Sequence, residues 1–302
     1  MTIHVISVGK SILDFLQDPY SKAEEELADQ IAAAAPKVLD LAGKTSSGEV
    51  SETLSSWLGD EVSPRLEELV EQLAPDQWPA AASAELDTFD KAARLRPRLT
   101  SGSTAVLIAS DTAQGLVSAL WNALALTGGN AKRVRYLPEL SPSFQGLRGT
   151  AMIARIPRLD ARNADDFRAA MGYLGELGYR LLDQVHRKSE KVRFYLSGGF
   201  KATIPYLIGL AEGMRSCDQV DVTACVLHEA TEATIELPLR RLYRETVEDE
   251  LEPFAFSDVS DIKPKIGVLE GYAYEKTADG RWELTAFGAG LKALYGMSNE
   301  AT

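Results

Sequence analysis

The residues of this chain best suited to chemistry are Ser197-Gly198-Gly199-Phe200-Lys201, which follow an apolar run and precede a segment with helical spacing. Glycines let a backbone approach a ligand closely and turn its N–H groups toward an anion. The amino end of the following helix favours the same anion. A lysine adds a full charge where a reacting phosphate becomes more negative. The motif predicts a phosphate site, although an ordinary strand-to-helix connection has the same spacing.

Two further polar segments, Gly9-Lys10-Ser11 and Ser110-Asp111-Thr112, also follow apolar runs. The Ser11 hydroxyl can donate to a phosphate or cap the next helix. Asp111 can act as a base, but Ser110 or Asp111 is equally suited to cap a helix. The letters GKS resemble the end of a phosphate-binding P-loop. The first glycine of that motif would fall on His4, however, which excludes a P-loop.

The three histidines, His4, His186 and His228, are scattered and give no metal-ligand spacing. We therefore predict no metal site and no cofactor. Arg180 and His186 fit the R-x(4–6)-H spacing of HEPN ribonucleases. They lie on one predicted helix inside an α/β unit, so an exposed helix face is the better interpretation. The sequence contains no GxSxG motif, so it gives no indication of a serine hydrolase of that type.

Strands and helices alternate along most of the chain. Apolar runs predict strands at Ile3–Val8, Thr104–Ala109, Arg133–Leu137 and Val192–Leu196, with a hairpin of Val220–Leu227 and Ala233–Leu237. Helical spacing predicts helices at 20–41, 50–73, 84–95, from Ala113 to Leu126, at Ala164–His186 and up to Arg215. This order predicts an α/β fold with a mainly parallel sheet. Ligands bind beyond the carboxyl ends of such strands, where the three polar segments fall.

The composition of the sequence and its pattern of predicted elements change after Arg244. An acidic linker, RETVEDELE, precedes a short predicted helix at Asp261–Tyr272 and a hairpin at Tyr274–Thr285, whose turn is Asp279-Gly280. A helix at Ala286–Tyr295 follows. This order resembles a winged helix-turn-helix, but residues 243–302 contain 6 basic and 12 acidic residues. Because DNA-reading modules need a basic face, we expect this segment to serve assembly or to cover a pocket.

Composition and charge set further limits. The chain has 302 residues, 45% hydrophobic and 25% charged, which is typical of a globular protein with a sizeable core. No apolar run is long enough to span a bilayer and no basic leader is present, so we expect a cytoplasmic protein. Cys217 and Cys225 form no CxxC pair. The net charge of −12 argues against general polyanion binding, but residues 128–215 hold 15 basic and 8 acidic residues, which favours a local anion pocket.

Four segments in order resemble the CRISPR-associated Rossmann fold (CARF) family, in particular its ring nucleases. They are VISVGKSIL, LIASDTAQGL, FYLSGGFKATIPYL and VLHEATEATIELPL. The resemblance covers residues 1–242, with a helical insertion at about 43–100, and residues 243–302 resemble the winged-helix tail of single-chain ring nucleases. It implies a Rossmann-like CARF domain followed by a small winged-helix-like domain.

The family's catalytic serine and lysine fall on Ser11 and Lys201. Its ligand-binding positions fall on Gly9, Lys10, Ser110, Asp111, Thr112, Ser197, Gly198, Gly199 and Phe200. One position departs from the pattern, because the family usually has a small hydroxylated residue where this chain has Lys10. An additional cation there would strengthen phosphate binding or change the preferred ring size.

The resemblance implies a homodimer that binds cyclic oligoadenylate, the messenger of type III CRISPR systems, and cleaves it without a metal. Cyclic tetra-adenylate is the expected substrate, and the products would be linear with a 2′,3′-cyclic phosphate. The alternative is a noncatalytic sensor whose winged-helix tails regulate DNA or a partner, which the acidic tail disfavours. A third reading, a CARF-coupled ribonuclease using Arg180 and His186, lacks the usual appended HEPN domain.

Overall fold

The computed structural model describes residues 1–18, 80–93, 98–137, 148–159, 164–184, 190–199, 201–217, 220–228 and 233–297, together with Tyr20, Glu25 and Asp29. Its strands are β1 (Thr2–Ser7), β2 (Ser103–Ala109), β3 (Val134–Leu137), β4 (Ala151–Arg155), β5 (Lys191–Tyr195), β6 (Asp221–Val226), β7 (Ile235–Leu237), β8 (Val259–Ser260), β9 (Tyr274–Lys276) and β10 (Trp282–Leu284). Its α-helices are α1 (Ser11–Gln17), α5 (Ala84–Ala93), α6 (Ala113–Leu126), α7 (Ala164–Gln184), α8 (Ile204–Ser216), α9 (Arg244–Leu251) and α10 (Ala286–Leu294). Short 3₁₀ helices are η4 (Ala80–Ala82), η5 (Ala131–Arg133), η6 (Lys201–Thr203) and η7 (Glu252–Phe254). The helices predicted at 20–41 and 50–73 lie outside the described residues, apart from single positions.

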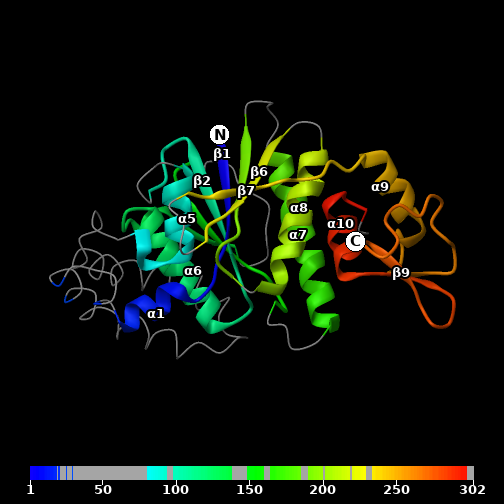
Figure 1. Ribbon diagram of the computed structural model, residues 1–302, viewed down its shortest axis with the longest axis horizontal. Helices are drawn as coiled ribbons and strands as arrows, with labels where there is room; N and C mark the ends of the chain where they lie inside the picture. Colours follow the sequence, from blue (N-terminus) through cyan, green and yellow to red (C-terminus); the bar gives the residue numbers. More distant parts are fainter. Residues whose placement is uncertain are drawn as a thin grey trace. The chain divides into compact units, whose positions relative to one another are not determined.

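The described strands β1 to β7 form one seven-stranded sheet in the order β3-β4-β2-β1-β5-β6-β7 (Figure 1). Strand β2 pairs in parallel with β1 and β4, and β3 pairs in parallel with β4. The predicted hairpin is present as the antiparallel pair β6–β7. Strands β1, β2 and β4 are buried along almost their whole length, as expected for a parallel sheet covered on both faces. The predicted α/β class is confirmed, although β4 has no counterpart among the predicted strands.

The chain divides into two compact units. The first consists of residues 1–155, 192–201 and 223–237, and the second of residues 156–191, 202–222 and 238–302. The expected division into domains 1–242 and 243–302 stays a prediction. In the first unit, helices α1, α5 and α6 pack on one face of the sheet. Their apolar side chains form a single core with alternate strand residues such as Ile6, Leu107 and Ile153.

The second unit is built on α7, α8 and α10, which lie side by side (Figure 1). Helices α7 and α10 approach so closely at Gly175 that a Cβ there would lie 2.0 Å from the Gly290 carbonyl oxygen. Strands β8, β10 and β9 form a small antiparallel sheet in that order. The predicted hairpin is confirmed as β9–β10, and its tip residue Gly280 has a φ of +92°, which suits glycine.

Two local predictions in the second unit are wrong. The acidic segment predicted as a linker forms α9, in which Arg244 pairs with Glu248 at 2.7 Å and Val247 and Leu251 are buried. The segment Asp261–Tyr272, predicted as a helix, consists instead of turns and bends. Three of its backbone N–H groups, at Ile266, Gly267 and Leu269, donate to the completely buried carboxylate of Glu250. Those groups are therefore not available to carbonyls four residues earlier, as a helix requires.

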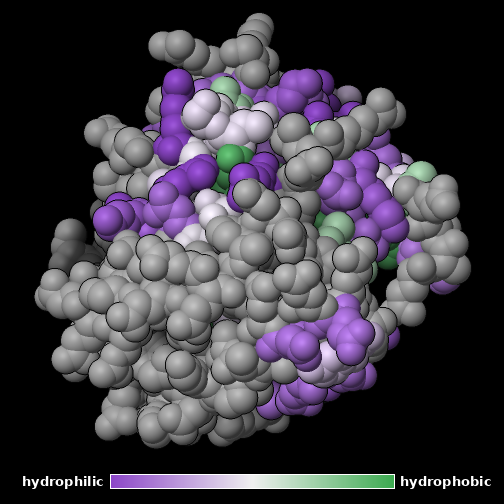
Figure 2. Space-filling view, turned by 90° about the vertical axis from the view of Figure 1, so that its left-hand side faces the viewer, coloured by the Kyte–Doolittle hydropathy of each residue, from purple (hydrophilic) through white to green (hydrophobic). Residues whose placement is uncertain are grey.

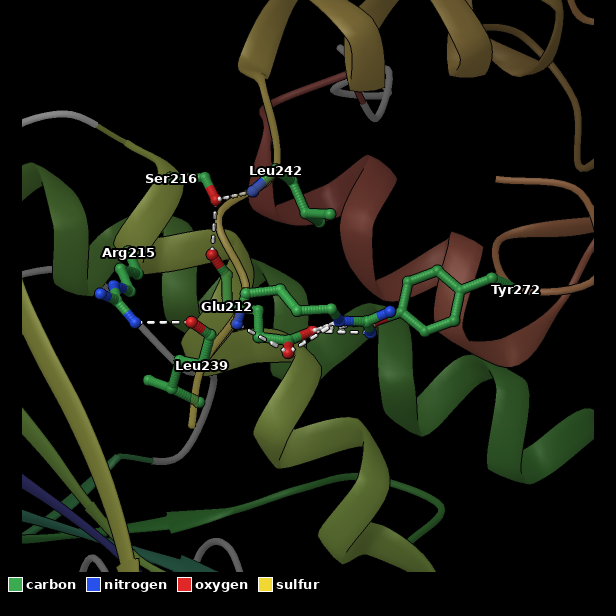
Figure 3. A network of polar contacts seen from close by, with 7 residues as sticks. Glu212, Arg215, Ser216, Leu239, Leu242 and Tyr272 are labelled. Atoms are coloured by element: carbon green, nitrogen blue, oxygen red, sulfur yellow. Dashed lines mark hydrogen bonds and ion pairs between the residues drawn. The ribbon is translucent and has the colours of Figure 1, made fainter. Parts of the chain in front are cut away.

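A polar network fixes the segment 239–242 onto α8 (Figure 3). The carboxylate of Glu212, whose side chain is 4% exposed, accepts hydrogen bonds from the Arg240 backbone and guanidinium and from the Tyr272 hydroxyl. Burial raises the pKa of Glu212, but these hydrogen bonds lower it more, so its pKa lies below the ordinary value. Arg215 donates to the Leu239 carbonyl at 2.5 Å. The charges in this network therefore stabilise the fold.

Among the coloured residues of the face in Figure 2, hydrophilic ones predominate and hydrophobic ones appear as small patches. Within the described ranges, no helix is both long enough and apolar enough to cross a membrane.

Candidate ligand-binding site

The turn after β1 is held by a carboxylate from α5. The Gly9 N–H donates to Glu85 Oε1 at 2.5 Å, and the Ser11 hydroxyl donates to Glu85 Oε2 at 3.0 Å. Ser11 Oγ also accepts a hydrogen bond from the Ala84 N–H at 3.1 Å. Ser11 is the first residue of α1, and the helix has Lys10 at its N-cap position without a side-chain capping bond. Ser11 therefore joins α1 to α5 instead of capping its own helix.

The glycine turn after β5 packs directly against the turn after β1. A Cβ on Gly9 would lie 2.7 Å from the Gly199 nitrogen, so the two backbones touch. Gly199 has a φ of +94°, and a Cβ there would lie 2.1 Å from Ser7 Oγ. Ser197 fixes the start of the turn, because its Oγ accepts from the Leu227 N–H at 2.7 Å. The glycines are thus required both by conformation and by close approach.

Glu85 lies where the two turns meet. It is 2% exposed, and a Cβ on Gly198 would lie 1.8 Å from its Oε1. Among the residues that the structure describes, no ion pair is formed by this carboxylate. The sequence analysis does not predict Glu85, although one signal exists. Glu85 stands four residues before buried Phe89 and next to buried Leu86, so a charge occupies the apolar face of α5.

The predicted cations are accessible. Lys10 has a 73% exposed side chain, and its Nζ lies 3.8 Å from Asp14 Oδ1. Lys201 is exposed, and within the described part of the chain no hydrogen bond or ion pair joins it to another residue. It begins η6, so α8 begins at Ile204, two residues later than a helix directly after the predicted turn would. Phe200 lies outside the described residues.

The segment after β2 forms a second cluster at the carboxyl edge of the sheet. Thr112, not Ser110 or Asp111, caps α6, because its Oγ1 accepts from the Gly115 N–H at 3.0 Å. Ser110 Oγ lies 2.9 Å from Thr112 Oγ1. Asp111 pairs with Arg155 at 2.5 Å, and both side chains are less than one-fifth exposed. The expectation that Ser110 or Asp111 caps the helix is wrong, because Arg155 at the end of β4 takes the carboxylate. Arg155 itself has no counterpart among the predicted site residues.

The histidines and Arg180 are placed elsewhere. His4 is 3% exposed inside the sheet, where its Nδ1 lies 2.9 Å from the Tyr195 hydroxyl. Arg180 pairs with Glu176 on the same helix, at the edge of a groove of about 780 Å³ between α7 and α10. His186 lies outside the described residues. In the ranges that the structure covers, no three His, Cys, Asp or Glu side chains are grouped so that they could hold a metal ion.

These contacts bring the residues of one candidate site together. Two glycine-bearing turns meet at the carboxyl edge of a parallel sheet, the place where such sheets bind ligands. Their backbone N–H groups and the Ser11 hydroxyl are hydrogen-bond donors suited to an anion. Glu85 receives two of these donors, and two accessible lysines flank the turns. The predicted residues of the β1 and β5 ends are thus brought together, while Asp111 and Thr112 form their own cluster.

The fold defines an α/β protein with a mainly parallel sheet, and the candidate site lies at the carboxyl edge of that sheet. Residues 80–240, more than half of the chain, match the family described as CRISPR-associated protein (Cas_APE2256). The chain therefore belongs to this CRISPR-associated family, which confirms the predicted link to CRISPR. No curated protein matches the chain. The match includes Glu85, the glycine turn and Lys201, and it begins after the turn that contains Ser11.

Proposed function

We propose that this protein is a ring nuclease. It binds cyclic oligoadenylate, with cyclic tetra-adenylate as the expected ring, and cleaves it to linear products that end in a 2′,3′-cyclic phosphate. The reaction removes the messenger and switches off type III CRISPR signalling. The CARF resemblance supports the substrate, and membership of a CRISPR-associated family supports the biological setting.

One observation carries this proposal: the contact between the turn after β1 and the glycine turn after β5. It places the Ser11 hydroxyl and the N–H groups of both turns at one edge of the sheet. Lys201 follows the glycine turn by two residues and is accessible. This edge thus combines neutral hydrogen-bond donors with a full positive charge beside them, a combination suited to a phosphodiester.

The chemistry needs alignment and charge stabilisation more than a strong base. The ribose 2′-oxygen attacks the adjacent phosphorus and loses its proton to solvent, and the bond from phosphorus to the 5′-oxygen breaks. The departing 5′-oxygen takes up a proton. We assign to Lys201 the stabilisation of the charge that grows on the phosphoryl and leaving oxygens. Ser11 holds the phosphate in line with the attacking oxygen.

The remaining predicted residues bind the ligand, and a second copy of the chain completes the site. Lys10 supplies a further cation, and the Ser110-Asp111-Thr112 segment lies on the same edge of the sheet. A cyclic ligand with two-fold symmetry suits two identical pockets around a two-fold axis, so we propose a homodimer. Light scattering that gives the mass of one chain, with and without cyclic tetra-adenylate, contradicts this part.

Incubation with cyclic tetra- and hexa-adenylate in EDTA, followed by separation of the products, tests the activity. Under single-turnover conditions Lys201→Ala should cleave on the order of 10²-fold more slowly, while its affinity falls much less. Ser11→Ala should be milder, because a positioning hydroxyl contributes less than a full charge. Lys276→Ala, which removes an exposed lysine from β9, is the matched control and should cleave at the wild-type rate.

Cleavage by Lys201→Ala at the wild-type rate would remove Lys201 from the mechanism. Binding without cleavage in the wild-type protein would favour the alternative, a cyclic oligoadenylate sensor. In that case the C-terminal segment with β8 to β10 and α10 becomes the candidate for the part that passes the signal to DNA or to a partner. Deletion of residues 245–302 would then abolish signalling to DNA or to a partner and leave ligand affinity unchanged.

A further inference from the structure

The carboxylate of Glu85 occupies the donors that a phosphate would need. Its Oε1 receives the Gly9 N–H and its Oε2 receives the Ser11 hydroxyl. The same carboxylate packs against Gly198 and is 2% exposed. The described residues therefore contain one anion at the meeting point of the two turns, and this anion belongs to the protein itself.

The surroundings of Glu85 are those of a bound anion. Backbone N–H groups at strand ends form concavities that attract negative charge. Glu85 also stands in the first turn of α5, where the helix dipole favours a negative group. A structural role requires only that these two donors find acceptors. A carboxylate at this place has the additional effect of repelling any second anion that approaches the same donors.

We propose that Glu85 is an internal competitor that holds the site closed in the unliganded protein and leaves it when a phosphate binds. The proposal rests on the proposed function for the identity of that phosphate, which is one linkage of cyclic oligoadenylate. Withdrawal of Glu85 frees the Gly9 N–H and the Ser11 hydroxyl together. One movement thus prepares both the binding turn and the serine that positions the phosphate.

Glycine-selective ¹⁵N labelling of the full chain provides a direct test with inorganic phosphate as the probe. Resonances of Gly9, Gly198 and Gly199 report on the turns while phosphate is added to the wild type and to Glu85→Gln. The glutamine can still accept from Gly9 but carries no charge, so its resonances should shift at about tenfold lower phosphate than those of the wild type. Asp87→Asn removes one charge from the same helix, where Asp87 pairs with Lys91, and should match the wild type.

Two results overturn the proposal. One is a Glu85→Gln protein that needs as much phosphate as the wild type, or more, and the other is glycine resonances that respond to phosphate in neither protein. If Glu85→Gln does not fold, Glu85→Asp replaces it. The shorter side chain keeps the charge but withdraws it from Gly9, so its phosphate affinity should also exceed that of the wild type.

A parallel titration with cyclic tetra-adenylate separates this inference from the proposed function. Tighter phosphate binding by Glu85→Gln, with no cyclic tetra-adenylate bound by any variant, supports the competitor and refutes the ring nuclease. Equal phosphate affinity in all variants, with cyclic tetra-adenylate bound and cleaved, refutes the competitor and leaves the ring nuclease standing.

Discussion

Acid should destabilise this protein through the buried histidine His4. His4 lies in β1 with 3% of its surface exposed, its ring centroid 4.9 Å from that of Phe89 and its Nδ1 2.9 Å from the Tyr195 hydroxyl. Burial, and then the charge of Arg193, lower its pKa from 6.5 to about 4. The folded protein thus binds a proton on His4 less readily than the unfolded chain does. The stability that His4 contributes is complete above pH 6.5 and is lost as the pH falls toward 4.

The size of this effect follows from the two pKa values. They differ by about 2.5, and each unit corresponds to about 1.4 kcal/mol, so the total loss is roughly 3 kcal/mol. Between about pH 8 and about pH 5 the expected loss is roughly 2 kcal/mol. That is a large fraction of the stability of an ordinary domain, since one or two kcal/mol already changes the ratio of folded to unfolded protein by a factor of about 5–30.

Urea unfolding at a series of pH values, followed by tryptophan fluorescence, measures this loss. His4→Phe cannot gain the proton. The unfolding free energy of the wild type minus that of the variant should therefore fall by roughly 2 kcal/mol from about pH 8 to about pH 5. Carboxylates titrate in both proteins and cancel in this difference. Parallel stability curves for the wild type and His4→Phe would refute the reasoning.

Two further substitutions test the site and the second unit. Gly198→Ala would place a Cβ 1.8 Å from Glu85 Oε1, so we expect a loss of about 1–3 kcal/mol in urea unfolding. Gly172→Ala, where a Cβ meets nothing within 4 Å, should be neutral or stabilising, and equal losses at both glycines would contradict this account. Arg240→Ala leaves the buried Glu212 carboxylate with fewer donors and should cost about 2 kcal/mol. The cost should fall in a Glu212→Gln background, and an unchanged cost would show that the pair contributes nothing.

Sequence patterns predict the parallel sheet because its strands are short apolar runs bounded by glycine or polar turns. They place the glycine turn and Ser11 correctly at strand ends, since the carboxyl ends of parallel strands share one edge. They fail for α9, whose acidic composition resembles a linker. That helix forms because its second face, with Val247 and Leu251, is buried. They also fail for Asp261–Tyr272, where distant donors and acceptors decide the backbone path.

Sequence patterns fail most clearly to predict the burial and the partners of two glutamates. Glu85 and Glu250 each lie on a helix and are 2% and 0% exposed, although glutamate is ordinarily a surface residue. Each is stabilised by backbone N–H groups from other segments, Gly9 in the first case and three residues between Ile266 and Leu269 in the second. Such partners are set by the tertiary fold, so the local sequence around a glutamate does not reveal them.

The hydrogen bonds of Ser11 distinguish the two proposed catalytic residues. A hydroxyl has one proton to donate, and Ser11 donates it to Glu85 while it accepts from the Ala84 N–H. In this arrangement it has no proton left for a phosphate oxygen. Lys201 faces no such competition, because it is exposed and nothing in the described part of the chain pairs with it. In the proposed mechanism the lysine is therefore ready before the ligand arrives, whereas the serine becomes available only when Glu85 withdraws. The proposal thus makes the state of one buried carboxylate decide when the candidate site positions a substrate.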